Sequence, residues 1–124
     1  MTDLHSPDLR RRLIDHLKDL SDLEYQKSNW GKLSEEGGTY DEFDYVVHFL
    51  YDDTELASKP YGMIGWCLRS EEEALSIQKL VAAIDQVFER NGLELSDQEY
   101  LHTSEWPLVL SEASNAYELL KLDQ

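Results

Sequence analysis

SEEEALSIQKLVAAIDQVFERNG, residues 70–92, is the stretch that decides the fold. Ser70 can cap the first turn of a helix, and Glu73 stands where it would complete a capping box. Six apolar residues then follow at the spacing of one helical face; they are Ile77, Leu80, Val81, Ile84, Val87 and Phe88. Asn91-Gly92 is typical of a helix end. The stretch therefore predicts a long amphipathic helix between Ser70 and Gly92.

Further helix starts are found on the N-terminal side of this stretch. Ser6-Pro7 predicts a helix over about residues 7–20, with a serine cap and a proline in its first turn. Ser21-Asp22 can cap a second, shorter helix. Thr39 can cap a third, because apolar residues follow it at helical spacing; they are Phe43, Val46, Val47 and Leu50.

The C-terminal side gives the same kind of signal. Ser96 can cap a short helical turn through Leu101, and Ser104 precedes a last helix that begins near Trp106. Residues 57–69 break the pattern, because Pro60, Gly62 and Gly65 interrupt an apolar run; a buried irregular segment or a short strand would fit.

Signals for strands are otherwise scarce along the chain. We therefore expect an all-α, single-domain bundle of five to six helices over residues 1–124, joined by short connections. A short extended segment near 61–68 is left open as an alternative.

The amino-acid composition of the chain limits the classes of molecule that it is expected to bind. The chain of 124 residues carries 26 acidic and 11 basic residues, for a net charge of −15. This excess disfavours binding to nucleic acid or to an anionic membrane surface, and it favours association with cationic partners. The single cysteine, Cys67, fits a reducing compartment. With no secretory signal and no long apolar segment, we expect a cytoplasmic protein.

The acidic residues concentrate in one region. Residues 33–58 contain eight Asp and Glu and no Lys or Arg, and three tyrosines are interleaved with them. This pattern fits a solvated helical face that maintains solubility, and it equally fits a docking surface for a basic protein, with tyrosine rings as anchors. The residues predicted to bind the partner are Glu35, Glu36, Tyr40, Asp41, Asp44, Tyr51, Asp52 and Asp53.

Two patterns raise the question of a metal site. Asp44, His48 and Asp52 share one helical stripe, but a helix rises about 6 Å in four residues, so one ion cannot bind all three. A solvated polar face is the plainer interpretation. Glu99-x-x-His102 matches a motif of dimetal bundles, which need a second copy that the chain lacks. We therefore expect no metal and no cofactor.

Two further features have ordinary explanations. Cys67 lies between Trp66 and Leu68 in an apolar run, which is typical of a buried cysteine rather than a nucleophile. The cluster Arg10-Arg11-Arg12 spans roughly 200° of a helix, so it forms no single basic patch and is expected to balance nearby acids. Because no other catalytic constellation is recognisable, the sequence does not indicate an enzyme.

Three groups of residues, scattered over about half of the chain, form a recognisable pattern: Leu20-Ser21-Asp22 with Tyr25 and Trp30, Tyr61-Gly62-x-Ile64 through Leu68-Arg69-Ser70 to Glu73-Ala74, and Tyr100-Leu101 with Trp106-Pro107. In these residues the chain resembles a family of small bacterial proteins, some of which are similar to immunity proteins of polymorphic or contact-dependent toxin systems. The resemblance implies a helical cytoplasmic domain that acts as a specific protein inhibitor. It implies no active-site residues, and it does not include the acidic region 33–58.

The leading hypothesis is thus a small acidic immunity protein that neutralises a basic toxin domain, such as a nuclease with a cationic cleft. One alternative is a small metal- or ligand-binding enzyme built around His48 or His102. Another is a regulatory or scaffold module, for example a homodimer that buries the acidic helix against the helix of Arg10-Arg11-Arg12.

Overall fold

In the computed structural model, the residues described are 4–31 and 42–122; residues 1–3, 32–41 and 123–124 lie outside this description. These described residues contain six α-helices: α1 (Pro7–Leu20), α2 (Leu23–Asn29), α3 (Glu42–His48), α4 (Glu71–Asn91), α5 (Asp97–Leu101) and α6 (Trp106–Lys121). A π-helix, η1 (Phe49–Asp53), continues α3, and a 3-10 helix, η2 (Pro60–Met63), precedes α4. The all-α prediction is confirmed.

Local capping explains several helix starts. The Ser70 hydroxyl accepts the N–H of Glu73 at 3.2 Å, and Asp22 accepts the N–H of Tyr25 at 3.0 Å. Ser96 and Glu99 form a complete capping box at α5. Each of these contacts satisfies a donor that a helix start would otherwise leave unpaired.

Two predicted caps differ from expectation. Ser6 precedes α1, but its side chain makes no capping hydrogen bond. The carboxylate of Glu73 does not return to the N–H of Ser70; it accepts the N–H of Arg69 at 2.7 Å and also binds Arg10. The predicted capping box at Ser70 is wrong because a buried arginine draws the Glu73 side chain inward.

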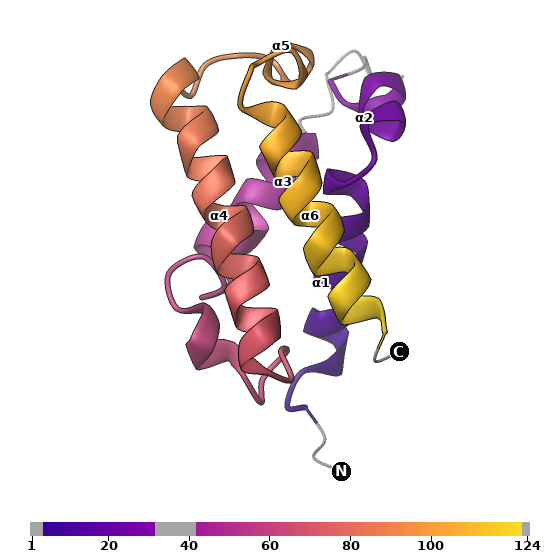
Figure 1. Ribbon diagram of the computed structural model, residues 1–124, viewed down its shortest axis with the longest axis vertical. Helices are drawn as coiled ribbons and strands as arrows, with labels where there is room; N and C mark the ends of the chain where they lie inside the picture. The colour runs from indigo at the N-terminus through magenta and orange to yellow at the C-terminus, as the bar shows by residue number, and fades with distance from the viewer. Residues whose placement is uncertain (1–3, 32–41, 123–124) are drawn as a thin grey trace.

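α6 runs antiparallel to α1 and α4 and packs against both, as Figure 1 shows. Small side chains allow this close approach, since Ala74 on α4 and Ala113 and Ala116 on α6 are fully buried. Larger residues fill the remaining space; Leu13, Leu17, Ile77, Leu80, Ile84, Val109 and Leu120 have no exposed surface. Burial of this apolar surface is the main stabilising contribution to the bundle.

The segment before α4 is irregular rather than a strand. Pro60–Met63 forms the 3-10 helix η2, and Ile64 and Leu68 meet only in an isolated bridge. Gly65 adopts a φ of 90°, a conformation that glycine tolerates, and donates its N–H to the Leu68 carbonyl at 2.8 Å. The strand alternative for 61–68 is therefore wrong, and the segment is irregular. It is only partly buried, because Tyr61, Ile64 and Trp66 are exposed.

Within residues 4–31 and 42–122, no helix combines the length and the apolar character that a membrane-spanning segment requires.

Candidate functional site

α3 and η1 carry three exposed aspartates and one exposed histidine, and we call this set the acidic face: Asp44, His48, Asp52 and Asp53. The imidazole of His48 lies between two carboxylates. Its Nδ1 is 2.6 Å from Oδ2 of Asp52, and its Nε2 is 3.5 Å from Oδ2 of Asp44. The side chains of Asp44 and Asp52 are 65% and 62% exposed, so both carboxylates also remain open to solvent.

The electrostatics of the acidic face follow from this arrangement. The hydrogen bond to Asp52 and the charge of Asp44 raise the pKa of His48, with Asp52 and Asp53 adding to the effect. Protonation of His48 adds one positive charge between two negative ones. The acidic face therefore keeps a negative charge whichever form the imidazole takes.

An aromatic cluster holds the start of α3 against the bundle. The ring of Phe43 lies 5.0 Å from Trp106, 5.3 Å from Tyr100, 5.5 Å from Phe88 and 5.8 Å from Trp30. Such aromatic pairs stabilise a fold beyond their burial alone. Because the cluster joins four other elements or connections to α3, the acidic face is presented by a well-packed support.

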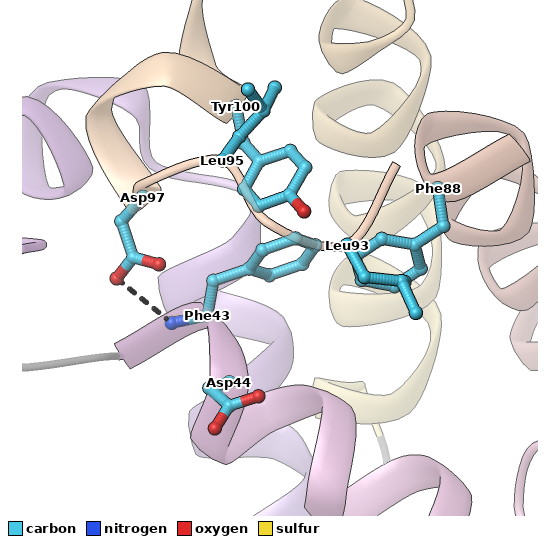
Figure 2. A pocket seen from close by; sticks show the side chains of 7 residues that line it. All are labelled: Phe43, Asp44, Phe88, Leu93, Leu95, Asp97 and Tyr100. Carbon is cyan, nitrogen blue, oxygen red and sulfur yellow. Dashed lines mark hydrogen bonds between the residues drawn. The ribbon is translucent and has the colours of Figure 1, made fainter. Parts of the chain in front are cut away.

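A buried carboxylate also orients α3. Oδ2 of Asp97, at the start of α5, accepts the backbone N–H of Phe43 at 3.3 Å, as Figure 2 shows. This N–H belongs to the first turn of α3, where a helix has no internal acceptor for it. Asp97 thus contributes to structure, and its negative charge suits the positive end of the helix dipole.

The end of η1 is tied to α4 by Tyr51. Its hydroxyl donates to Asp85 at 2.6 Å and lies 3.4 Å from the carbonyl oxygen of Val81. Burial, together with the hydrogen bond to Asp85, raises the pKa of the Tyr51 phenol well above its usual value. Tyr51 is half-buried, so its hydroxyl is occupied within the protein and its ring forms part of the surface.

Two hollows adjoin the acidic face and share Asp44, Phe88 and Leu93 in their linings. The first, of about 250 Å³, also reaches Phe43, Leu95, Asp97 and Tyr100 and is the pocket drawn in Figure 2. The second, of about 400 Å³, also reaches Val47, Tyr51 and Asp52. We call the two together the α3–α4 groove.

The structure places half of the predicted partner-binding residues. Asp44, Tyr51, Asp52 and Asp53 all belong to α3 or η1, and the first three line the groove. The other four lie outside the described residues; they are Glu35, Glu36, Tyr40 and Asp41.

Sequence reasoning missed the apolar half of this site. Phe88 was assigned only to the core stripe of its helix, and Leu93 was not assigned at all. Leu93 is 76% exposed, directly after the end of α4. A leucine that follows a glycine helix stop, outside any helical stripe, is the signal that could have identified it. Tyr45, 64% exposed on α3, is a further surface ring beside the acidic face.

The residues considered as metal ligands or as a nucleophile are accounted for by the fold. Glu99 is held in the capping box of α5, where it accepts the N–H of Ser96 at 3.0 Å. Cys67 is fully buried, and this burial raises the pKa of its thiol to about 11, so the thiolate is not present at neutral pH. No group of three His, Cys, Asp or Glu residues positioned for a metal ion occurs within the described parts of the chain.

The three consecutive arginines lie in three different environments. Arg10 is 2% exposed and forms a bidentate pair with Glu73 at 2.8 and 2.9 Å; it also donates to the carbonyls of Cys67 and Leu120. Arg11 pairs with Asp8 at 3.2 Å on the surface, and Arg12 lies over the ring of Phe49 at 5.0 Å. Arg10 and Arg11 therefore each pair with an acid, as expected, although the partner of Arg10 is 63 residues away in the sequence.

The burial of Arg10 bears on the homodimer alternative. A dimer that pairs the acidic helix with the Arg10-Arg11-Arg12 helix would need these guanidinium groups at the surface. Since Arg10 is enclosed by the chain itself, only Arg11 and Arg12 remain exposed there.

Comparison with known proteins gives one family. The chain belongs to the family described as Domain of unknown function (DUF7945), whose model matches residues 4–124. Searches of curated proteins and of solved structures found no match. The family description names no activity.

Proposed function

We propose that this protein is a small acidic binding protein of the immunity type, which attaches to a basic toxin domain in the cytoplasm and blocks it. The observation that carries the proposal is that the carboxylates of the acidic face have no lysine or arginine partner within the described protein and lie beside a groove. Among the described residues, Asp44, Asp52 and Asp53 form no ion pair with Lys or Arg, and two of them border an apolar groove.

Charge and packing support the proposal together. A surface that serves only solubility needs scattered charges, whereas an interface combines charged groups with apolar area that a partner can cover. The acidic face and the α3–α4 groove are adjacent, since Asp44 and Asp52 belong to both. A net charge of −15 would also accelerate the approach of a cationic partner.

The mode of inhibition follows from the chemistry of the partner. A nuclease needs a cationic cleft for phosphates. Carboxylates presented on α3 and η1 can occupy such a cleft in place of phosphates. Inhibition would then require no catalytic residue in this protein, only a fit between its acidic face and the cleft.

The product of a neighbouring gene that encodes a basic toxin domain provides the test. We expect it to bind the purified protein with an affinity that falls at least tenfold when salt rises from 50 to 300 mM, because exposed charges are screened. We also expect toxin activity to be blocked at a one-to-one ratio. Absence of binding, or binding that does not depend on salt, would contradict the proposal.

The alternative of a metal-binding enzyme predicts a different result. It would require Zn²⁺ or Mn²⁺ to bind in stoichiometric amount and to shift the NMR signals of His48. We expect the His48→Gln variant to retain toxin binding. Loss of toxin binding in this variant, together with stoichiometric metal in the purified wild type, would favour the alternative.

A further inference from the structure

The α3–α4 groove has the chemistry of a site for a cationic side chain with an apolar stem. Its walls contain Phe88, Leu93 and Val47, and the half-buried ring of Tyr51 extends them. All charged residues that line it are acidic: Asp44, Asp52 and Asp97. Of these, Asp97 is occupied by α3. Asp44 and Asp52 both contact His48, but their side chains are about two-thirds exposed, so an occupant can still reach the two carboxylates.

The size of the groove limits its occupant. Sites for drug-sized ligands and cofactors usually span about 300–1,000 Å³ and enclose most of the ligand. The first hollow, of about 250 Å³, lies below that range, the second, of about 400 Å³, lies near its lower end, and both are open. They suit one or two side chains of a protein segment rather than an enclosed small molecule.

Arginine matches this groove better than lysine. Its planar guanidinium stacks on aromatic rings, is weakly hydrated and pairs with carboxylates through two parallel hydrogen bonds. The groove offers aromatic rings at Phe88 and Tyr51, and the carboxylate of Asp44 or Asp52 at its rim. The ammonium of lysine would gain the charge interaction without the stacking.

We propose that the α3–α4 groove receives an arginine, with an adjoining apolar residue, from a basic segment of the partner protein. The arginine stem and its neighbour cover Leu93 and Phe88, and the guanidinium meets the rim carboxylates. This inference rests on the proposed function in one respect only, namely that the partner is basic. Beyond the proposed function, it specifies the surface that binds the partner and the type of residue that the partner inserts.

Leu93 offers a sharp test because it can be changed without disturbing the fold. It is 76% exposed, and so is Leu122 near the end of the chain, which does not line the groove. Leu93→Ser and Leu122→Ser therefore remove the same exposed side chain at two positions. Equal stability of the two variants in urea would establish that any difference in binding belongs to the surface.

The probe is a synthetic peptide, acetyl-GSRLRSG-amide, with control peptides in which both arginines are replaced by lysine or by glutamine. Binding is followed by NMR chemical-shift changes of the backbone amides. We expect changes in residues 43–53 and 88–97, a dissociation constant several-fold weaker for the lysine peptide, and none measurable for the glutamine peptide. Leu93→Ser should weaken binding about tenfold, and Leu122→Ser by less than twofold.

Several results would overturn the inference. One is a set of shift changes centred elsewhere, such as the exposed Trp66. Others are equal binding of the arginine and lysine peptides, binding of the glutamine peptide, or no binding at several millimolar. Equal losses for the two leucine variants would do the same. Concentration-dependent shifts without peptide that map to the groove would assign it to a second copy of this chain.

The toxin experiment separates this inference from the proposed function. If the toxin binds wild type and Leu93→Ser equally, the groove inference fails and the immunity function stands. If the arginine peptide binds the groove and the neighbouring toxin does not bind, the immunity function fails and the groove inference stands.

Discussion

The protein contains two charged clusters that form a direct physical contrast. In the Arg10–Glu73 pair, both side chains are nearly inaccessible, and the guanidinium also donates to the carbonyls of Cys67 and Leu120. On the acidic face, Asp44 and Asp52 are about two-thirds exposed and share one imidazole. The first cluster joins α1, α4 and α6 inside the bundle, and the second projects from α3 and η1 into solvent.

The contrast shows how the position of a charge determines its use. Within the bundle, a charge must be paired and fully hydrogen-bonded, because desolvation is costly. At the surface, a carboxylate needs no partner and remains free to meet a cation from another molecule. The sequence places both clusters on helices, so only the fold reveals which is structural and which is available for binding.

The largest expected effect is on the buried pair. Arg10→Met leaves the Glu73 carboxylate without its guanidinium, and we expect the free energy of unfolding to fall by about 3–5 kcal/mol. Urea denaturation followed by circular dichroism measures it. The neighbouring Arg11→Met, at an exposed position, should change stability by less than about 0.5 kcal/mol.

A double variant sharpens this result. Arg10→Met with Glu73→Leu removes both charges, so we expect it to regain part of the stability that Arg10→Met loses. A double variant as unstable as the single one would show that the arginine contributes mainly by packing and by its bonds to the carbonyls. An equal loss for Arg10→Met and Arg11→Met would contradict the contrast altogether.

A smaller effect is expected where the acidic face is attached to the bundle. Tyr51→Phe removes the hydrogen bond to Asp85, and we expect a loss of about 1 kcal/mol in the free energy of unfolding. Tyr61→Phe, at an exposed ring, is the matched control. Hydrogen exchange should also rise in residues 49–53 of the Tyr51 variant. Unchanged stability and exchange would mean that the tyrosine does not hold η1 on α4.

The smallest effect concerns protonation of the acidic face. Because its neighbours raise the pKa of His48, the protonated imidazole stabilises α3 and η1 fully below its ordinary pKa, and this contribution is lost as pH rises through the raised value. The pKa of His16 is shifted downwards instead. Burial and the charge of Arg12 lower it, and the charge of Asp15 offsets only part of this effect.

An NMR titration of the imidazole signals checks this prediction. We expect His48 to titrate above His16, and Asp52→Asn to lower the pKa of His48 by removing its main hydrogen-bond partner. If Asp52→Asn leaves the titration of His48 unchanged, the imidazole is not held between the carboxylates in solution.

Local signals in the sequence account for much of this fold. The start of α4 at Ser70, the proline in the first turn of α1 and the capping box of α5 depend on residues a few positions apart. Each predicted helix is present among the described residues, whereas Thr39, the predicted cap of the third helix, lies outside them. The acidic face was predictable for the same reason, because Asp44, His48 and Asp52 recur at intervals of four residues.

The remaining features depend on contacts between distant segments. Arg10 and Glu73 are 63 residues apart, and Tyr51 and Asp85 are 34 apart. The α3–α4 groove likewise depends on distant contacts, since the packing of Phe43 on Phe88 and the bond of Tyr51 to Asp85 hold α3 and η1 beside α4. No spacing within one helix signals such pairs, and the π-helix that ends α3 has no local signature in this sequence.

The central claim is that the acidic face binds a basic partner, and one measurement tests it most directly. Calorimetric titration of the neighbouring toxin domain compares wild type, Asp44→Asn with Asp52→Asn, and the control Asp15→Asn, which removes an exposed charge from α1. We predict that the double variant remains folded and binds about 10–100-fold more weakly, and that the control binds like wild type. Equal affinities for all three proteins would contradict the account.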